Sequence, residues 1–146
     1  MSKSNDSENA LLLLIFNNTG IANIGDATGL RGSTVPGSLF VALHTADPGE
    51  AGTAITSETT YTGYARKAVA RSGAGWVVTG ASVSPAVNVD FPECTALPGG
   101  AIGFFSIVST ASGAGIILYS GTLTPAITMA VGVIPFVKTT STIVED

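Results

Sequence analysis

The sequence has little cysteine, histidine or charge, and each shortage excludes a class of protein. Its one cysteine, Cys94, has no partner for an intrachain disulfide or for a zinc site built from several thiolates. Its one histidine, His44, offers too few nitrogen ligands for zinc. Only six lysines and arginines are present. Because phosphate binding uses clustered basic side chains, no nucleic-acid partner is expected.

The shortage of charge also bears on the surface of the folded protein. Charged residues make up 11% of the chain, against about 25% in an average soluble domain. The net charge is −4 and the mean hydropathy is +0.47. Such a surface lacks the like-charge repulsion that keeps proteins apart. The composition therefore predicts a protein that lives in an assembly; the alternative is a compact monomer covered by neutral threonine and serine.

No segment is expected to enter a membrane or to act as a secretory leader. The longest apolar run, Ala10 to Phe16, is far shorter than the roughly 20 residues of a transmembrane helix. The residues before it, Ser4 to Glu8, lack the positive flank of a signal peptide. With 146 residues the chain has the size of one ordinary domain. We expect it to fold and assemble in the cytoplasm of the cell that makes it.

The N-terminal part predicts a short helix followed by a long loop. Acidic residues precede the apolar run and Gly20 follows it, which predicts a helix from about Ser7 to Asn18 with a glycine C-cap. Its apolar side chains run nearly all the way round, so it must be covered by its own domain or by a neighbouring subunit. Residues 17–38 form either an arm that reaches neighbours or a flexible linker. We therefore divide the chain into a helix and arm (1–37) and a body (38–146).

The body reads as short strands separated by turn residues. Seven to eight strands with almost no helix predict a mainly β fold, an antiparallel β-sandwich or jelly roll. Pro85 favours a sheet edge or a bulge. The Ser-Gly-Ala-Gly segments at 72–75 and 112–115 are interpreted as hairpin turns. The expected strands are 39–44, 64–71, 76–79, 83–91, 101–108, 115–123, 131–137 and 139–144.

The chemistry-bearing residues do not form a catalytic pattern. Cys94 and His44 lie in no nucleophile motif, and an isolated cysteine is most often a small buried hydrophobe. We expect His44 to hydrogen-bond at a sheet end while Asp47 starts a turn. The acidic residues around it are too sparse for calcium. The sequence predicts no enzyme, no cofactor and no metal.

Half of the basic residues, Arg66, Lys67 and Arg71, fall within six positions. On a strand, Lys67 and Arg71 share one face and Arg66 lies on the other. One interpretation is a solvated edge that discourages strand pairing with other molecules. The other is a salt bridge to an acidic patch on a partner subunit.

Six segments together resemble a family of small tailed-bacteriophage virion proteins, often labelled tail-fibre proteins. The resemblance covers most of the chain from about residue 8. It is carried by Leu39 to Gly52 (LFVALHTADPGEAG), Tyr61 to Arg66 (YTGYAR), Arg71 to Trp76 (RSGAGW), Phe91 to Thr95 (FPECT), Ile102 to Phe104 (IGF) and Gly113 to Gly121 (GAGIILYSG).

The resemblance implies a non-enzymatic structural role in the virion. Proteins of this size and β content are similar to capsid cement (decoration) proteins, which sit as oligomers over joints between capsomers. The first hypothesis is thus a dimeric or trimeric cement protein that binds the major capsid protein on the outer capsid surface. The second is a tail, neck or fibre component, and the third a soluble enzyme or small-molecule binder. Ten residues are candidate partner contacts: Leu11, Leu12, Leu14, Ile15, Phe16, Arg31, Asp47, Glu50, Arg66 and Arg71.

Overall fold

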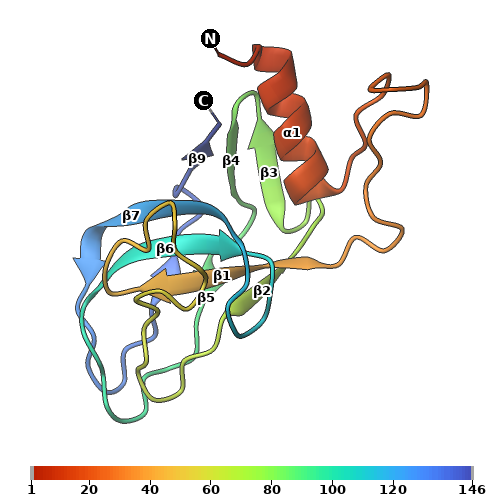
Figure 1. Cartoon of the computed structure of the whole chain (residues 1–146). Coiled ribbons are helices and arrows are strands. Elements are labelled where there is room, and N and C mark those ends of the chain that lie inside the picture. Colours follow the sequence, from red (N-terminus) through yellow and green to blue (C-terminus); the bar gives the residue numbers. More distant parts are fainter. Residues whose placement is uncertain (1, 146) are drawn as a thin grey trace. The chain divides into compact units, whose positions relative to one another are not determined.

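The computed structural model describes residues 2–145, and this part of the chain is mainly β with one short helix (Figure 1). All of the strand pairings whose register is given are antiparallel. This confirms the predicted fold class and is consistent with a β-sandwich. The elements are α1 (Asn5–Asn17), β1 (Ser38–His44), β2 (Lys67–Ala70), β3 (Trp76–Thr79), β4 (Ser82–Pro85), β5 (Val89–Asp90), β6 (Ile102–Val108), β7 (Ile117–Ile127), β8 (Phe136–Val137) and β9 (Ile143–Val144).

The chain forms two compact units. Unit 1 comprises Met1–Ser38, Val69–Asn88 and Lys138–Asp146, and unit 2 comprises Leu39–Ala68 and Val89–Val137. The first segment of unit 1 ends beside the boundary expected between residues 37 and 38. Unit 1 also takes in two later segments that the sequence analysis assigned to the body.

Helix α1 is capped at both ends by its neighbours in sequence. The Ser4 side chain accepts a hydrogen bond from the Ser7 backbone N–H, and Asp6 and Glu8 place negative charge in the first turn. At the other end Asn18, with φ 58°, adopts the left-handed conformation. The expected C-cap at Gly20 was therefore wrong by two positions, because asparagine also tolerates this conformation.

The core of unit 1 forms between α1 and the hairpin β3–β4. Leu12 and Phe16 are completely buried, and the Phe16 ring meets the Trp76 ring edge to face at 4.9 Å. Strand β4 pairs with β3 on one side and with β9 on the other, so that Val83 is buried in the middle of this sheet. The covering that α1 was expected to need is thus supplied on one side by Trp76.

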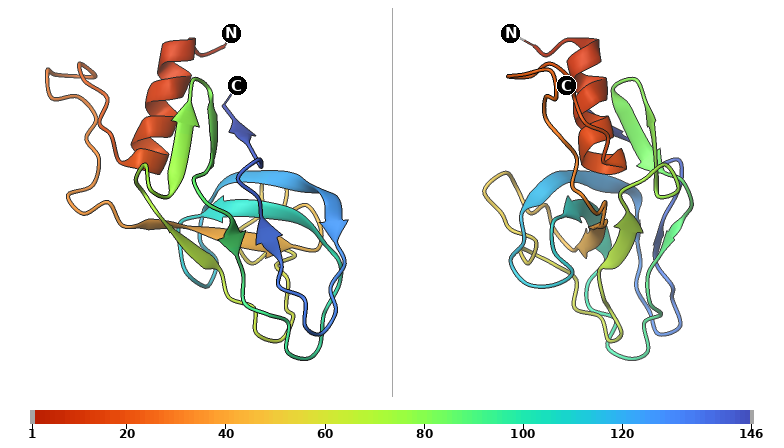
Figure 2. Two further views of the ribbon diagram at one scale, coloured as in Figure 1. Left: turned by 180° about the vertical axis from the view of Figure 1, so that it is seen from behind. Right: turned by 90° about the vertical axis from the view of Figure 1, so that its right-hand side faces the viewer.

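Unit 2 is built on a curved sheet with the strand order β2-β1-β6-β7, in which the chain passes from unit 2 to unit 1 within β2. Figure 2 shows β6 and β7 (cyan and blue) running side by side. In β1 and β6 most side chains on both faces are buried, whereas β7 alternates between half-buried and exposed side chains. The short strands β5 and β8 form a second sheet. Cys94 is buried and unpaired, as predicted.

Several expected strands are shorter than their apolar runs. The run 83–91 is divided into β4 and β5, with the break directly after Pro85. The runs 131–137 and 139–144 contribute only two residues each, because only those residues find a partner strand. Residues 112–115 connect the paired strands β6 and β7, as predicted. Residues 72–75 do not form the expected hairpin turn, since β2 and β3 belong to different sheets.

Candidate functional site

The most polar interior feature of unit 2 is an ion pair between Arg66 and Glu58. The guanidinium donates from Nε and one terminal nitrogen to the two carboxylate oxygens at 2.7 and 2.8 Å. It also donates to the backbone carbonyls of Thr110 and Gly113, at 3.0 and 2.8 Å. The Arg66 side chain is only 2% exposed. The hydrogen bonds to Glu58 raise the pKa of Arg66. The hydrogen bonds to Thr110 and Gly113 hold the 45–66 segment against the β6–β7 connection.

Two further polar side chains complete this network. The Tyr64 hydroxyl donates to Glu58 at 2.8 Å and accepts from the Leu43 N–H at 3.1 Å. The His44 ring contacts the Thr56 carbonyl through Nδ1 and the Ser106 hydroxyl through Nε2, at 2.8 and 2.7 Å. Burial raises the pKa of Tyr64 and lowers that of His44. Every one of these groups is engaged in holding the fold, so the network acts as an internal clamp.

The structure confirms the sequence interpretation of His44 and Asp47. His44 is fully buried at the end of β1, and the Asp47 carboxylate accepts from the Gly49 N–H at 2.9 Å and so starts a turn. Within residues 2–145 no group of three or more His, Cys, Asp or Glu side chains is placed to hold a metal ion. In the same range no helix has the length and apolar character needed to cross a membrane.

In unit 1, Arg71 binds the C-terminal end of helix α1. Helix α1 has no basic residue in its last turn. Arg71 supplies that charge from the β2–β3 connection: its Nε donates to the Ile15 carbonyl at 2.7 Å and a terminal nitrogen donates to Leu14 at 2.8 Å. Two of the carbonyls that a helix end leaves without partners are thereby satisfied by a cation.

The same arginine fixes the base of the long loop, which we call the arm (residues 18–37). Its other terminal nitrogen donates to the Ser33 hydroxyl and the Pro36 carbonyl. Across the base, the Asn18 amide donates to the Ser33 carbonyl at 2.8 Å and accepts from the Ser33 N–H at 2.6 Å. The arm is therefore a closed loop with both ends held, rather than a slack linker.

The tip of the arm is also fixed by hydrogen bonds. Ile21 and Leu30 exchange two backbone hydrogen bonds, and the Asp26 carboxylate accepts from the Thr28 and Gly29 N–H groups. Gly29 has φ +62°, and a Cβ there would lie 1.9 Å from the Ile21 carbonyl oxygen, so only glycine fits. The hydrogen bonds to Thr28 lower the pKa of Asp26. A defined turn thus closes the arm at its outer end.

This ordered loop presents apolar side chains to solvent. Val35 is 76% exposed, and Ile24 and Leu30 are about half exposed. Arg31 is also exposed, and in the described residues its guanidinium has no hydrogen-bond or ion-pair partner. Large apolar side chains held in the open on a fixed loop are typical of interaction sites. The arm is the candidate functional site of unit 1.

Unit 2 contains a groove between the turn at 47–50 and the start of β7. Its volume is about 350 Å³, and it is lined by Asp47, Gly49, Glu50 and residues 117–120. Both carboxylate side chains are exposed. The groove therefore combines two exposed carboxylates with the exposed apolar side chain of Leu118, while its neighbour Ile117 packs against the core.

The ten predicted contact residues fall into distinct environments. Leu12 and Phe16 are completely buried in unit 1, and Leu11, Leu14 and Ile15 are partly buried on α1. The guanidinium groups of Arg66 and Arg71 are engaged inside their own units. Only Arg31, Asp47 and Glu50 have exposed side chains.

Sequence reasoning did not single out the exposed apolar residues of the arm. Ile24, Leu30 and Val35 stand among glycines, threonines and asparagines, and no periodicity marks such isolated side chains. The only signal was the length of the loop itself. Their exposure becomes visible once Asn18 and Arg71 are seen to hold the arm open.

A comparison with family models shows to which family the chain belongs. The model described as Gp80, "Podophage GP4 fiber I protein gp80", matches residues 2–145. The chain belongs to the Gp80 family. This agrees with the resemblance to tailed-phage virion proteins and makes the chain a phage structural protein of a fibre family. A search of curated proteins finds no match.

Proposed function

We propose that this Gp80-family chain is a structural component of the podophage fibre apparatus, and that its arm joins it to a neighbouring virion protein. The observation that carries the proposal is the arm itself: both ends are held, the tip is closed, and Ile24, Leu30 and Val35 are exposed. A loop ordered before binding loses little conformational entropy when it docks.

The physical logic of such a joint is burial of apolar surface by many weak contacts. Each exposed aliphatic side chain that becomes buried contributes about 1.5–3 kcal/mol. One arm therefore gives a modest affinity, but several arms in one particle act together through their effective concentration. The low charge of the chain, 11%, leaves little repulsion against such close packing.

The fibre location is preferred to the capsid cement role because the family description names a fibre protein. The two differ in stoichiometry. Quantitative mass spectrometry of purified virions, scaled to the major capsid protein, should find a few to a few tens of copies per particle. A ratio near one copy per capsid subunit, or a simple fraction of it, would instead establish the cement role on the outer capsid surface.

A second experiment tests the arm. In phage that depend on a supplied copy of this protein, the triple variant I24S/L30S/V35S should fold but be lost from purified particles. The matched control is V87S/L97S/V131S, which removes three exposed aliphatic side chains outside the arm. Equal incorporation of the two triple variants would refute the arm as the joint.

A further inference from the structure

The groove of unit 2 has the chemistry of a receptor for a short apolar and basic segment. Asp47 and Glu50 line it with exposed carboxylates, and Leu118, 37% exposed, supplies an apolar side chain. The turn that carries the two carboxylates is fixed by the hydrogen bond from Gly49 to Asp47. An occupant would therefore meet a preformed site.

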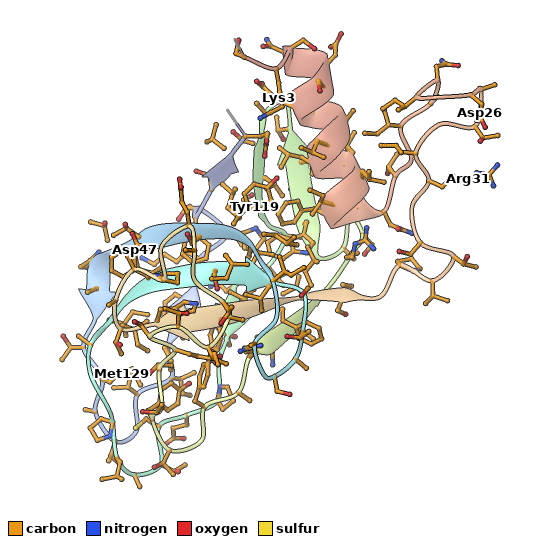
Figure 3. The ribbon with its side chains drawn as sticks, viewed as in Figure 1. Lys3, Asp26, Arg31, Asp47, Tyr119 and Met129 are labelled. Atoms are coloured by element: carbon orange, nitrogen blue, oxygen red, sulfur yellow. The ribbon has the colours of Figure 1, made fainter. Side chains whose placement is uncertain are left out.

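The arm of unit 1 carries the complementary pair of side chains. Leu30 is 47% exposed and Arg31 follows it directly. Figure 3 shows the Arg31 side chain directed away from the arm. An aliphatic group and a guanidinium at adjacent positions match a groove that offers the Leu118 side chain and two carboxylates.

The surroundings of the six basic residues show which of them is suited to enter the groove. Of the six basic residues, Lys3 pairs with Glu145, Arg66 pairs with Glu58, and Arg71 binds helix carbonyls. The remaining three, Arg31, Lys67 and Lys138, are exposed. Among them, in the described chain, Arg31 alone lies on a projecting loop next to an exposed large apolar side chain.

We infer that the arm of one copy docks into the groove of a second copy, with Arg31 against Asp47 and Glu50 and with Leu30 against Leu118. This inference rests on the proposed function, since it takes the arm as a joint and names the partner as another copy of the chain. The two surfaces differ, so the contact is head to tail. Repeated contacts of that kind build rings or open filaments, as a fibre assembly requires.

Disulfide trapping tests the contact with the full-length protein. The variants R31C and D47C are purified separately, mixed and oxidised; Cys94 is buried and does not compete. We expect several-fold more disulfide-linked dimer than in mixtures of K67C with D47C or of R31C with D90C, which use other exposed charged positions. Equal yields in the three mixtures would overturn the inference.

Charge reversal provides an independent measurement. Sedimentation velocity of the wild type should show concentration-dependent association that weakens with salt. R31E and the double variant D47R/E50R should each weaken it about tenfold or more, and a mixture of the two variants should recover part of it. The matched control K67E should associate like the wild type. Association of R31E equal to that of the wild type would overturn the proposed docking.

The two proposals can fail separately. If the arm variant is lost from virions while the purified protein stays monomeric and untrapped, the arm binds a different virion protein and only this inference is refuted. If trapping succeeds while the arm variant enters virions normally, copies dock to one another but the arm is not the joint that the proposed function requires.

Discussion

Two arginines five positions apart in sequence each stabilise one unit, Arg66 unit 2 and Arg71 unit 1, by different means. Arg66 in unit 2 faces a carboxylate, Glu58, in a bidentate pair that is almost completely buried. Arg71 in unit 1 faces only neutral oxygen atoms, among them the carbonyls of Leu14 and Ile15 at the end of α1. One clamp neutralises a charge with a charge, and the other balances a cation with a helix dipole.

The two clamps protect different parts of the molecule. Removing one member of a buried ion pair leaves the other charge without compensation, so the Arg66 clamp should be required for folding of unit 2. Removing Arg71 leaves neutral oxygen atoms and no unpaired charge, so its loss should cost less stability and should also loosen the arm. Three measurements test whether the two clamps differ in this way.

The largest effect is expected for R66M. The Glu58 carboxylate, with its side chain 15% exposed, would be left without its cation, which costs about 3–5 kcal/mol of unfolding free energy. Chemical denaturation measures this loss. The double variant R66M/E58L should cost clearly less than the sum of the two single variants, because the charges are removed together. The neighbouring exposed Lys67 is the control, and K67M should change stability by less than about 0.5 kcal/mol. A loss below 1 kcal/mol for R66M would contradict the clamp.

An intermediate effect is expected for R71M. The last turn of α1 loses a cation and two charge-assisted hydrogen bonds, which should cost about 2 kcal/mol. Because the arm loses its hold on Ser33 and Pro36, trypsin should also cleave after Arg31 faster than in the wild type. The variant R71K keeps the charge, so its stability and its rate of cleavage should lie between those of the wild type and R71M. Unchanged cleavage after Arg31 would show that Asn18 alone holds the arm.

The smallest effect concerns His44 in the unit 2 network. Burial lowers its pKa below the ordinary value of 6.5, so the unfolded chain binds the proton more tightly than the folded one. The contribution of neutral His44 to stability is therefore fully present above pH 6.5. It decreases as the pH falls below that value, by at most about 1.4 kcal/mol per pH unit. Denaturation between pH 5 and 7 should show this slope, and H44Q should flatten it. Parallel profiles of the two proteins would exclude His44 as the cause.

Local patterns predicted the elements that local patterns control. The helix was expected within about two residues of its observed start, because the acidic residues Asp6 and Glu8 are local signals for a helix start. Strands such as β1, β3 and β6 follow continuous apolar runs bounded by turn residues, and they were expected nearly as they occur. The two-residue strands β5, β8 and β9 were overestimated, because the length of a strand depends on its partner and not on its own run.

Partners that are distant in sequence escaped prediction for a related reason. Arg66 and Arg71 were expected to be either a solvated edge or contacts to another subunit, and the structure engages both inside the chain. Nothing local marks Ile15 as a partner of Arg71. The same applies to Asn18 and Ser33, whose pairing decides that the arm is held open rather than slack.

Three features could be predicted from the sequence: the fold class, the low content of charged residues, which favours assembly, and the roles of His44 and Asp47. These follow from composition, periodicity and turn chemistry, which act between neighbours in the chain. The folded structure settles which cations find partners inside the units and which one, on the arm, is left exposed beside an apolar side chain. That outcome depends on contacts between distant segments, because a charge finds its partner through the folded path of the chain and not through its place in the sequence.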